Sequence, residues 1–380
     1  MAEQKKQFNY NISRLIEYCE LFDKIVAKDD YKRKYDDLEN TVKHVKTLIS
    51  VYQRIGLTHV PWSLTYKLSA AGIEFGLTQP TQGTQEWLNQ RLDRISASDI
   101  GSALGVNEYK EPEIVIIDKC GYPNKWWWDP VASVRFTHHG HKFEFVASQI
   151  HEVDHGVKCY EASFVPHPTI DFIGASPDKF ALDEKNKRGY LVEIKCPYRR
   201  YPKINVVPPA YWVQMQIQME VTNLEECYFE DCRILEYYDE NAFLEDETAP
   251  RHRGVIGAMQ DLVAETTHYI YPKLVRDDGQ KETLEEMNER QKQEIMEVVK
   301  EHRAKSEKYY FTGFTWWQLA MHQSILVLRD RKWFAEALPK LDAFWKKVLW
   351  HREHGYDDLV RKFNQPTLAE WEAMQKENAE

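Results

Sequence analysis

Three residues in one short stretch have side chains suited to hydrolytic chemistry. A polar turn at residues 184–189 separates two apolar, β-prone runs. Asp178 lies before this turn, and Glu193 and Lys195 lie after it. Such a pattern predicts a β-hairpin. Because side chains alternate along a strand, Glu193 and Lys195 should point to one face, with Asp178 opposite them. The sequence therefore predicts two carboxylates and one lysine within a small volume.

This combination is typical of a divalent-metal site. Carboxylate oxygens are hard ligands that suit Mg²⁺ or Mn²⁺, and a neighbouring lysine can help to deprotonate or orient an attacking water. The alternative is an ordinary Glu/Lys pair on a surface hairpin, since a short E-x-K motif often arises by chance. The segment Ser176–Pro177–Asp178, at hairpin distance from Glu193 and Lys195, favours the site.

Four sequence blocks surround and include this stretch. They are residues 87–101, residues 140–144, residues 175–178 with 193–197, and residues 211–216. In their residues and order the chain resembles the phage lambda exonuclease and YqaJ-type viral recombinase family, within the PD-(D/E)xK nuclease superfamily. The resemblance covers about residues 80–240. It implies an α/β, restriction-endonuclease-like core, in which helices flank a central mixed sheet.

The resemblance also implies roles for individual residues. One or two Mg²⁺ (or Mn²⁺) ions would be held by Asp178, Glu193, Glu144 and the backbone carbonyl of Ile194. Lys195 would activate or orient the attacking water. A tyrosine and two glutamines of the family match Tyr211, Gln214 and Gln216. Gln214 joins the catalytic set, and Tyr211 and Gln216 are expected to contact the DNA. Gln218 is outside the match, although it shares a helical face with Tyr211 and Gln214.

Candidate DNA contacts lie on both sides of the hairpin. Ser96 or Ser98 could cap a following helix, and the nearby Arg91 favours an anion site, which the resemblance identifies with DNA phosphate. Arg199 and Arg200, interleaved with tyrosines, suit a track along a DNA backbone. Between residues 185 and 203 there are seven basic residues and one acidic residue, which predicts a basic rim. The net charge of −10 for the whole chain argues mildly against a nucleic-acid partner.

The implied activity is processive 5′-to-3′ degradation of one strand of duplex DNA. The 3′ single strands left behind would serve recombination or repair through a single-strand annealing protein, and a homotrimeric ring is implied by the resemblance alone. There are two alternatives. One is a structure-selective endonuclease on the same core, and the other is a non-catalytic DNA-binding protein. The complete set of Asp178, Glu193 and Lys195 argues against the non-catalytic alternative.

Length and patterning predict three regions in the 380 residues: a helical N-terminal extension at 1–80, the nuclease core at 81–245 and a helical C-terminal region at 246–380. Within the last, residues 274–308 and 333–350 read as helices and 311–317 as an aromatic loop. The sequence contains no run of eighteen apolar residues, so it predicts no membrane span. Six cysteines without a dense framework indicate a reducing, intracellular compartment, in the cytoplasm or nucleus of a host.

Other metal centres are less well supported by the sequence. Five histidines lie between residues 138 and 155, but no cysteine or acidic partner shows the spacing of a structural zinc site. The cysteines also lack the tight spacing of iron–sulfur ligands. Neither zinc nor an iron–sulfur cluster is therefore expected.

Overall fold

The structure is a computed structural model. It describes residues 84–377 apart from 124–129, 163, 168, 184, 186–187 and 249, together with two paired strands, β1 (Tyr10–Asn11) and β2 (His59–Val60). Apart from these two strands, the helical extension predicted over residues 1–80 lies outside the described residues.

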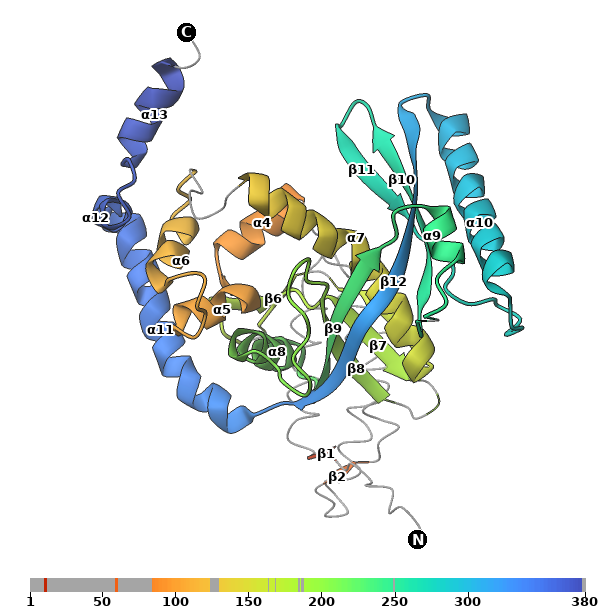
Figure 1. Cartoon of the computed structure of the whole chain (residues 1–380). Helices are drawn as coiled ribbons and strands as arrows, with labels where there is room; N and C mark the ends of the chain where they lie inside the picture. The colour runs from red at the N-terminus through yellow and green to blue at the C-terminus, as the bar shows by residue number, and fades with distance from the viewer. Residues whose placement is uncertain are drawn as a thin grey trace, which may run out of the picture.

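A seven-stranded mixed sheet forms the centre of the described chain (Figure 1). Its strands are β4 (Lys158–Glu161), β7 (Lys179–Asp183), β8 (Arg188–Lys195), β9 (Glu226–Glu236), β10 (Arg253–Asp261), β11 (Thr266–Ile270) and β12 (Tyr309–Leu328). They lie in the order β11–β10–β12–β9–β8–β7–β4, and only β8 and β9 are parallel neighbours. The predicted hairpin is the antiparallel pair of β7 and β8.

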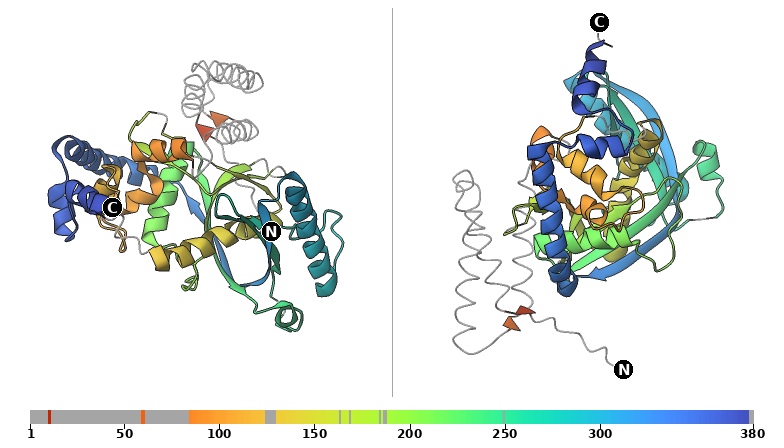
Figure 2. Two further views of the ribbon diagram at one scale, coloured as in Figure 1. Left: turned by 90° about the horizontal axis from the view of Figure 1, so that it is seen from above. Right: turned by 90° about the vertical axis from the view of Figure 1, so that its left-hand side faces the viewer.

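Two helices cover opposite faces of the sheet around β8. α7 (Pro130–His155) packs an apolar face, including Phe143, Val146 and Ile150, against a cluster that contains Val192 and Ile194. α8 (Pro209–Thr222) packs Met215 and Met219 against a cluster that contains Leu191 and Phe229. Alternate residues of β8 therefore face different helices. The long strands are visibly curved (Figure 2), and this mixed sheet flanked by helices confirms the predicted fold class.

A smaller sheet lies on the α8 side of the molecule. It consists of β3 (Ile95–Ser96), β6 (Ile173–Ala175) and β5 (Val165–Pro166), with β3 parallel to β6. It shares one apolar core with α8 and with α5 (Ala97–Ala103), α6 (Pro112–Lys119) and α11 (Arg331–His354). α4 (Gln85–Leu92) leads into this sheet, while α12 (Asp357–Lys362) and α13 (Leu368–Glu377) follow α11. Among the described residues, no helix is long and apolar enough to cross a bilayer.

The C-terminal region is not purely helical, which corrects the prediction from the sequence. α9 (Glu240–Leu244) and α10 (Leu284–Lys305) are helices, but β10, β11 and β12 extend the central sheet beyond residue 246. Residues 311–317, expected as a loop, lie within β12. Aromatic and β-branched residues favour strands, and β12 is long enough to pair with both β10 and β9. The division expected at residue 245 therefore falls within one sheet.

Gly174 of β6 provides a test of this packing. A Cβ atom at this position would lie 2.2 Å from Cζ of the fully buried Phe164. We expect Gly174→Ala to lower the free energy of unfolding by about 1–3 kcal/mol, since an overpacked core must shift. Gly140→Ala in α7 is the matched control, because its Cβ would meet no atom within 4 Å. Replacing a helical glycine should stabilise the protein by up to about 1 kcal/mol. Urea unfolding curves measure both changes, and equal effects would contradict the packing described.

Candidate active site

Glu193 of β8 is the centre of the site. Its side chain has no exposure to solvent and faces α8. Oε1 of Glu193 accepts hydrogen bonds from Nζ of Lys195 and, at 2.7 Å, from Nε2 of Gln214, while its Oε2 accepts from Nε2 of Gln218 at 2.6 Å. A carboxylate can be buried only when such partners replace water. Neighbouring residues of β8 and α8 supply those partners.

Asp178 joins this cluster from the end of the loop that leads into β7. Its Oδ2 accepts a hydrogen bond of 2.7 Å from the backbone N–H of Ile194 and lies 3.7 Å from Nζ of Lys195. Lys195 also donates to the carbonyl oxygen of Ile194 at 3.1 Å, and its Nζ lies 5.2 Å from the ring centre of Tyr211. The structure thus brings Asp178, Glu193, Lys195 and the Ile194 carbonyl together.

The charges of this cluster strongly influence one another. Burial raises the pKa of Glu193 to about 7, with the negative charge of Asp178 as the second cause, and Lys195 opposes both. Burial lowers the pKa of Lys195, but attraction to Glu193 and then Asp178 outweighs it and leaves this pKa above its ordinary value. One ammonium is therefore shared by two crowded carboxylates.

Glu144 of α7 brings a third carboxylate to the cluster. Its side chain is about one third exposed, and its Oε1 lies 3.9 Å from Nζ of Lys179. Burial raises the pKa of Glu144 to about 7, and the second cause is the charge of Asp178, which places the two carboxylates near each other. Three carboxylates with limited cationic compensation form an oxygen-rich site that suits a divalent cation.

The face of α8 that points to the cluster differs from the family-derived expectation at one position. Gln214 bonds Glu193 as expected, but Gln216 faces away: its Nε2 donates to the carbonyl of Leu328, and its Oε1 accepts from the N–H of Asp330. Gln218 occupies the site instead. The helical spacing of residues 211, 214 and 218 was the signal for this arrangement.

A second polar cluster surrounds Arg91 of α4. Its Nη2 donates to Oγ of Ser96 at 3.2 Å and to Oγ of Ser98 at 3.1 Å, and its guanidinium lies 4.5 Å from the ring centre of Trp87. Among the described residues, no carboxylate lies within ion-pair distance of Arg91; nearby Asp99 pairs with Lys119 and Lys110. Burial lowers the pKa of Arg91, against the charges of Asp99 and Asp118, but a guanidinium stays protonated.

Strand pairing connects this cluster to the carboxylates. Ser96 of β3 pairs with Gly174 of β6, four residues before Asp178. The Cα atoms of Ser96 and Asp178 are therefore within about 20 Å of each other. In addition, Gly101 of α5 packs against Ala210, which precedes Tyr211. The predicted anion-binding residues and the predicted metal ligands thus belong to one packed unit.

The two arginines of the predicted basic rim have different surroundings. Arg200 donates from Nη1 and Nη2 to the two carboxylate oxygens of the buried Asp231, at 2.6 and 2.9 Å. Arg199 is exposed, with its guanidinium 5.2 Å from the ring centre of Phe136. Arg200 is therefore engaged within the protein, contrary to its expected place on an open basic track, while Arg199 remains accessible.

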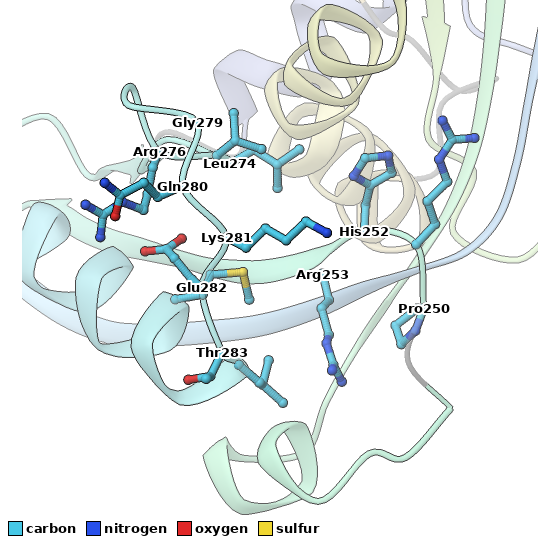
Figure 3. A pocket seen from close by; sticks show the side chains of 14 residues that line it. Pro250, His252, Arg253, Leu274, Arg276, Gly279, Gln280, Lys281, Glu282 and Thr283 are labelled. Atoms are coloured by element: carbon cyan, nitrogen blue, oxygen red, sulfur yellow. The ribbon is translucent and has the colours of Figure 1, made fainter.

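A cavity of about 640 Å³ lies elsewhere in the fold (Figure 3). Residues 250–253 line one side, and residues 274–276, 279–284 and 287 line the other. Several of its basic side chains have protein partners: Arg251 and His252 bond Asp154, and Arg276 bonds Asp278. Its lining residues, all within the described part of the chain, differ from those of the carboxylate cluster. The cavity is therefore separate from the candidate active site.

The chain is similar to several known proteins. A mimivirus protein, uncharacterised protein R354 of Acanthamoeba polyphaga mimivirus, is 28% identical over 320 residues, which cover 75% of this chain and 56% of that protein. An alkaline exonuclease from Laribacter hongkongensis is similar in structure with a TM-score of 0.39 and 19% identity, over 74% of this chain and 98% of that one. A phage-related exonuclease from Haemophilus somnus 129PT gives a TM-score of 0.32 and 11% identity, over 71% and 96%.

The family comparison covers the whole site. Residues 86–225 match the YqaJ-like viral recombinase domain. This segment contains Arg91 and its two serines, the carboxylates on α7, β8 and the loop before β7, Lys195, and the polar face of α8. Every residue of the candidate site therefore falls within the segment that is similar to this domain.

Proposed function

We propose that this protein is a metal-dependent deoxyribonuclease that degrades duplex DNA from an end. The observation that carries the proposal is the convergence of Asp178, Glu193, Glu144 and Lys195 on one small volume. Oxygen ligands beside a lysine are suited to phosphodiester hydrolysis. The match of residues 86–225 to a viral recombinase domain supports the same chemistry.

The residues present fit one or two Mg²⁺ or Mn²⁺ ions. The ligands would be the carboxylates of Asp178, Glu193 and Glu144 with the carbonyl of Ile194, a hard oxygen set. Burial, and after it the negative charge of Asp178, raises the pKa values of Glu193 and Glu144, and a bound divalent cation would stabilise their charged forms. Within the described residues, Oγ of Ser176 and Oε1 of Gln218 are buried without hydrogen-bond partners, so the site retains unused polar atoms.

In this proposal the protein groups position the reactants. A bound ion would polarise the scissile phosphate and lower the pKa of water. Lys195, held by Glu193, Asp178 and the Ile194 carbonyl, has an ammonium that can orient the attacking water and stabilise charge on the phosphate oxygens. Gln214 and Gln218 fix the orientation of Glu193 through its two oxygens. This preorganisation limits side-chain rearrangement during reaction.

The Arg91 cluster is proposed to hold the 5′-phosphate at a DNA end. A guanidinium can grip a terminal phosphate with two parallel hydrogen bonds, and Ser96 and Ser98 add hydroxyl groups beside it. Degradation would then proceed 5′ to 3′ and leave 3′ single strands for recombination or repair. An annealing protein that receives these strands and a homotrimeric assembly remain part of the proposal.

Removal of the active-site groups tests the chemistry. We expect Lys195→Ala, Asp178→Asn and Glu193→Gln each to slow digestion of linear duplex DNA by at least about 100-fold, because each removes a group that acts on the reacting phosphate or its metal. EDTA should stop digestion, and Mg²⁺ should restore it. Release of acid-soluble nucleotides measures the rate.

The matched control is Lys300→Ala, since Lys300 is an exposed lysine on α10, outside the carboxylate cluster and the basic rim. This variant should digest DNA at close to the parent rate. A near-parent rate in any of the three site variants would show that the site is misassigned. Covalently closed DNA should resist the parent protein, and cutting of closed and linear DNA at similar rates would favour an endonuclease.

The role of Arg91 is tested with the DNA end. The parent should digest 5′-phosphorylated duplex faster than the same duplex with a 5′-hydroxyl, and Arg91→Lys should lose most of this preference, because lysine keeps the charge but not the planar fork. Initial rates on both duplexes and a melting curve measure the effect. Equal parent rates on the two ends would exclude the phosphate pocket. Lost stability with an unchanged preference would make Arg91 a structural residue.

The two rim arginines should behave differently. Arg199→Ala should weaken DNA binding and reduce the slope of log K against log salt by about 1, because an accessible phosphate contact is lost. Arg200→Ala should instead lower stability by about 3 kcal/mol or more, because Asp231 would be left buried and unpaired. Salt-dependent binding to duplex DNA and unfolding curves separate the two effects. An unchanged salt slope for Arg199→Ala would show that Arg199 does not contact the DNA backbone.

A further inference from the structure

Tyr109 lies on a loop beside the Arg91 cluster, and its side chain is 94% exposed. The loop joins α5 to α6 (Figure 1). Gly105, with a φ of 70°, ends α5 in the left-handed region, and the N–H of Val106 donates to the carbonyl of Gly101 at 2.7 Å. This arrangement is typical of a helix end that reverses the chain. The loop is therefore bonded to the end of α5 and does not leave it freely.

Hydrogen bonds on both sides of Tyr109 hold the loop. The amide of Asn107 donates to Oγ of the buried Ser102 at 3.0 Å, and its Oδ1 accepts from the N–H of Tyr109 at 2.9 Å. On the other side, Nζ of Lys110 lies 3.2 Å from Oδ1 of Asp99. The ring of Tyr109 is outside this network, because nearly all of its surface faces solvent. The protein thus fixes the backbone that carries this ring and leaves its two faces open.

Asp99 also connects the loop to the proposed phosphate pocket. Its second oxygen, Oδ2, accepts a hydrogen bond of 2.6 Å from Oγ of Ser96, which in turn accepts from Arg91. Consecutive Cα atoms are about 3.8 Å apart and an extended lysine side chain spans about 6 Å, so through Lys110 the Cα of Tyr109 lies within about 14 Å of the Asp99 carboxylate. Tyr109 is therefore within reach of a nucleotide whose phosphate occupies the pocket.

The chemistry of the loop favours an uncharged, flat ligand. Exposed Glu108 precedes the tyrosine and disfavours backbone phosphate, and the charge of Lys110 is already paired with Asp99 and Asp118. An aromatic face is suited to the π-face of a nucleobase, and such stacking tolerates any base. The loop and the Arg91 cluster thus offer two different subsites to one nucleotide, one for its base and one for its phosphate.

We propose that Tyr109 stacks on the base of the 5′-terminal nucleotide of the DNA. This inference rests on the proposed function, in which Arg91 holds the phosphate of the same nucleotide. A phosphate held alone leaves its nucleotide free to rotate, whereas a second contact on the base fixes the orientation of the DNA end. The phosphodiester that follows is then presented to the carboxylate cluster in one geometry, which lowers the entropic cost of reaction.

Two duplexes that differ by one base test this contact. One has an ordinary 5′-phosphorylated end, and the other has the same phosphate on an abasic 5′-terminal nucleotide. Binding is measured in EDTA, which prevents digestion. The parent should bind the abasic end about 5- to 100-fold more weakly, which is the range for stacking one base on an aromatic side chain. Tyr109→Ala should bind both ends with equal affinity. The lost base pair affects both proteins alike and cancels in this comparison.

Tyr238→Ala is the matched control, since Tyr238 is 96% exposed and lies between β9 and α9, apart from the α5–α6 loop (Figure 1). It should distinguish the two ends as the parent does. Tyr109→Trp should also distinguish them, because tryptophan keeps an aromatic face. In digestion of the ordinary duplex, Tyr109→Ala should raise KM and leave kcat close to the parent value, because stacking is equal in the ground and transition states.

Other outcomes overturn the contact. Equal affinity of the parent for the two ends would exclude stacking, and full discrimination by Tyr109→Ala would assign it to another residue. A lower unfolding temperature of Tyr109→Ala, with kcat and KM both changed, would make Tyr109 a structural residue. The proposed function has its own readout: equal digestion of phosphate and hydroxyl ends rejects the Arg91 pocket even when the missing base is detected. A parent that prefers the phosphate but ignores the missing base rejects only the stacking, and a parent that binds neither end rejects both.

Discussion

The arrangement of the site depends on the burial of one carboxylate. Glu193 lies in the middle of a mixed sheet, where water is replaced by Lys195, Gln214 and Gln218. Satisfying this charge fixes the rotation of α8 relative to β8, because residues 214 and 218 must face the strand. It also brings Lys195 beside Asp178. A single buried acidic side chain thus couples strand register, helix orientation and the position of the lysine.

Side chains alternate along each strand, and this alternation places different polar groups on the two faces of the sheet. In β9, Phe229 and Asp231 face α8, and the residue between them, Glu230, faces α7. Each buried acid has basic partners that belong to its own face: Arg200 for Asp231 and histidines for Glu230. A shift of register by one residue would exchange these environments and leave both charges unpaired. The polar clusters therefore specify the pairing as well as the site.

The sequence predicts this architecture where local patterns determine it. The hairpin, the strand that carries Glu193 and Lys195, and the helix that carries Gln214 follow from alternation and helical spacing. The role of Gln216 does not follow from such local patterns, because its partners, residues 328 and 330, lie more than a hundred positions away. Arg200 was misread for the same reason, because a basic run does not reveal a buried acid on a neighbouring strand. The strands beyond residue 246 were missed because aromatic side chains around Gly313 suggested a loop, while long-range pairing with β9 and β10 decides the structure.

The extended strand β12 explains why the C-terminal region belongs to the same unit as the site. Its second half pairs with β9, which is itself parallel to β8, so the site strand is two strands away from β12. Its last residue, Leu328, accepts the hydrogen bond of Gln216, and Asp330 beyond it donates its backbone N–H to the same side chain. Gln216 therefore anchors α8 to the C-terminal region from the side opposite Gln214. Because α8 is held on both sides, the polar face that orients Glu193 cannot rotate without breaking contacts at the start of α11.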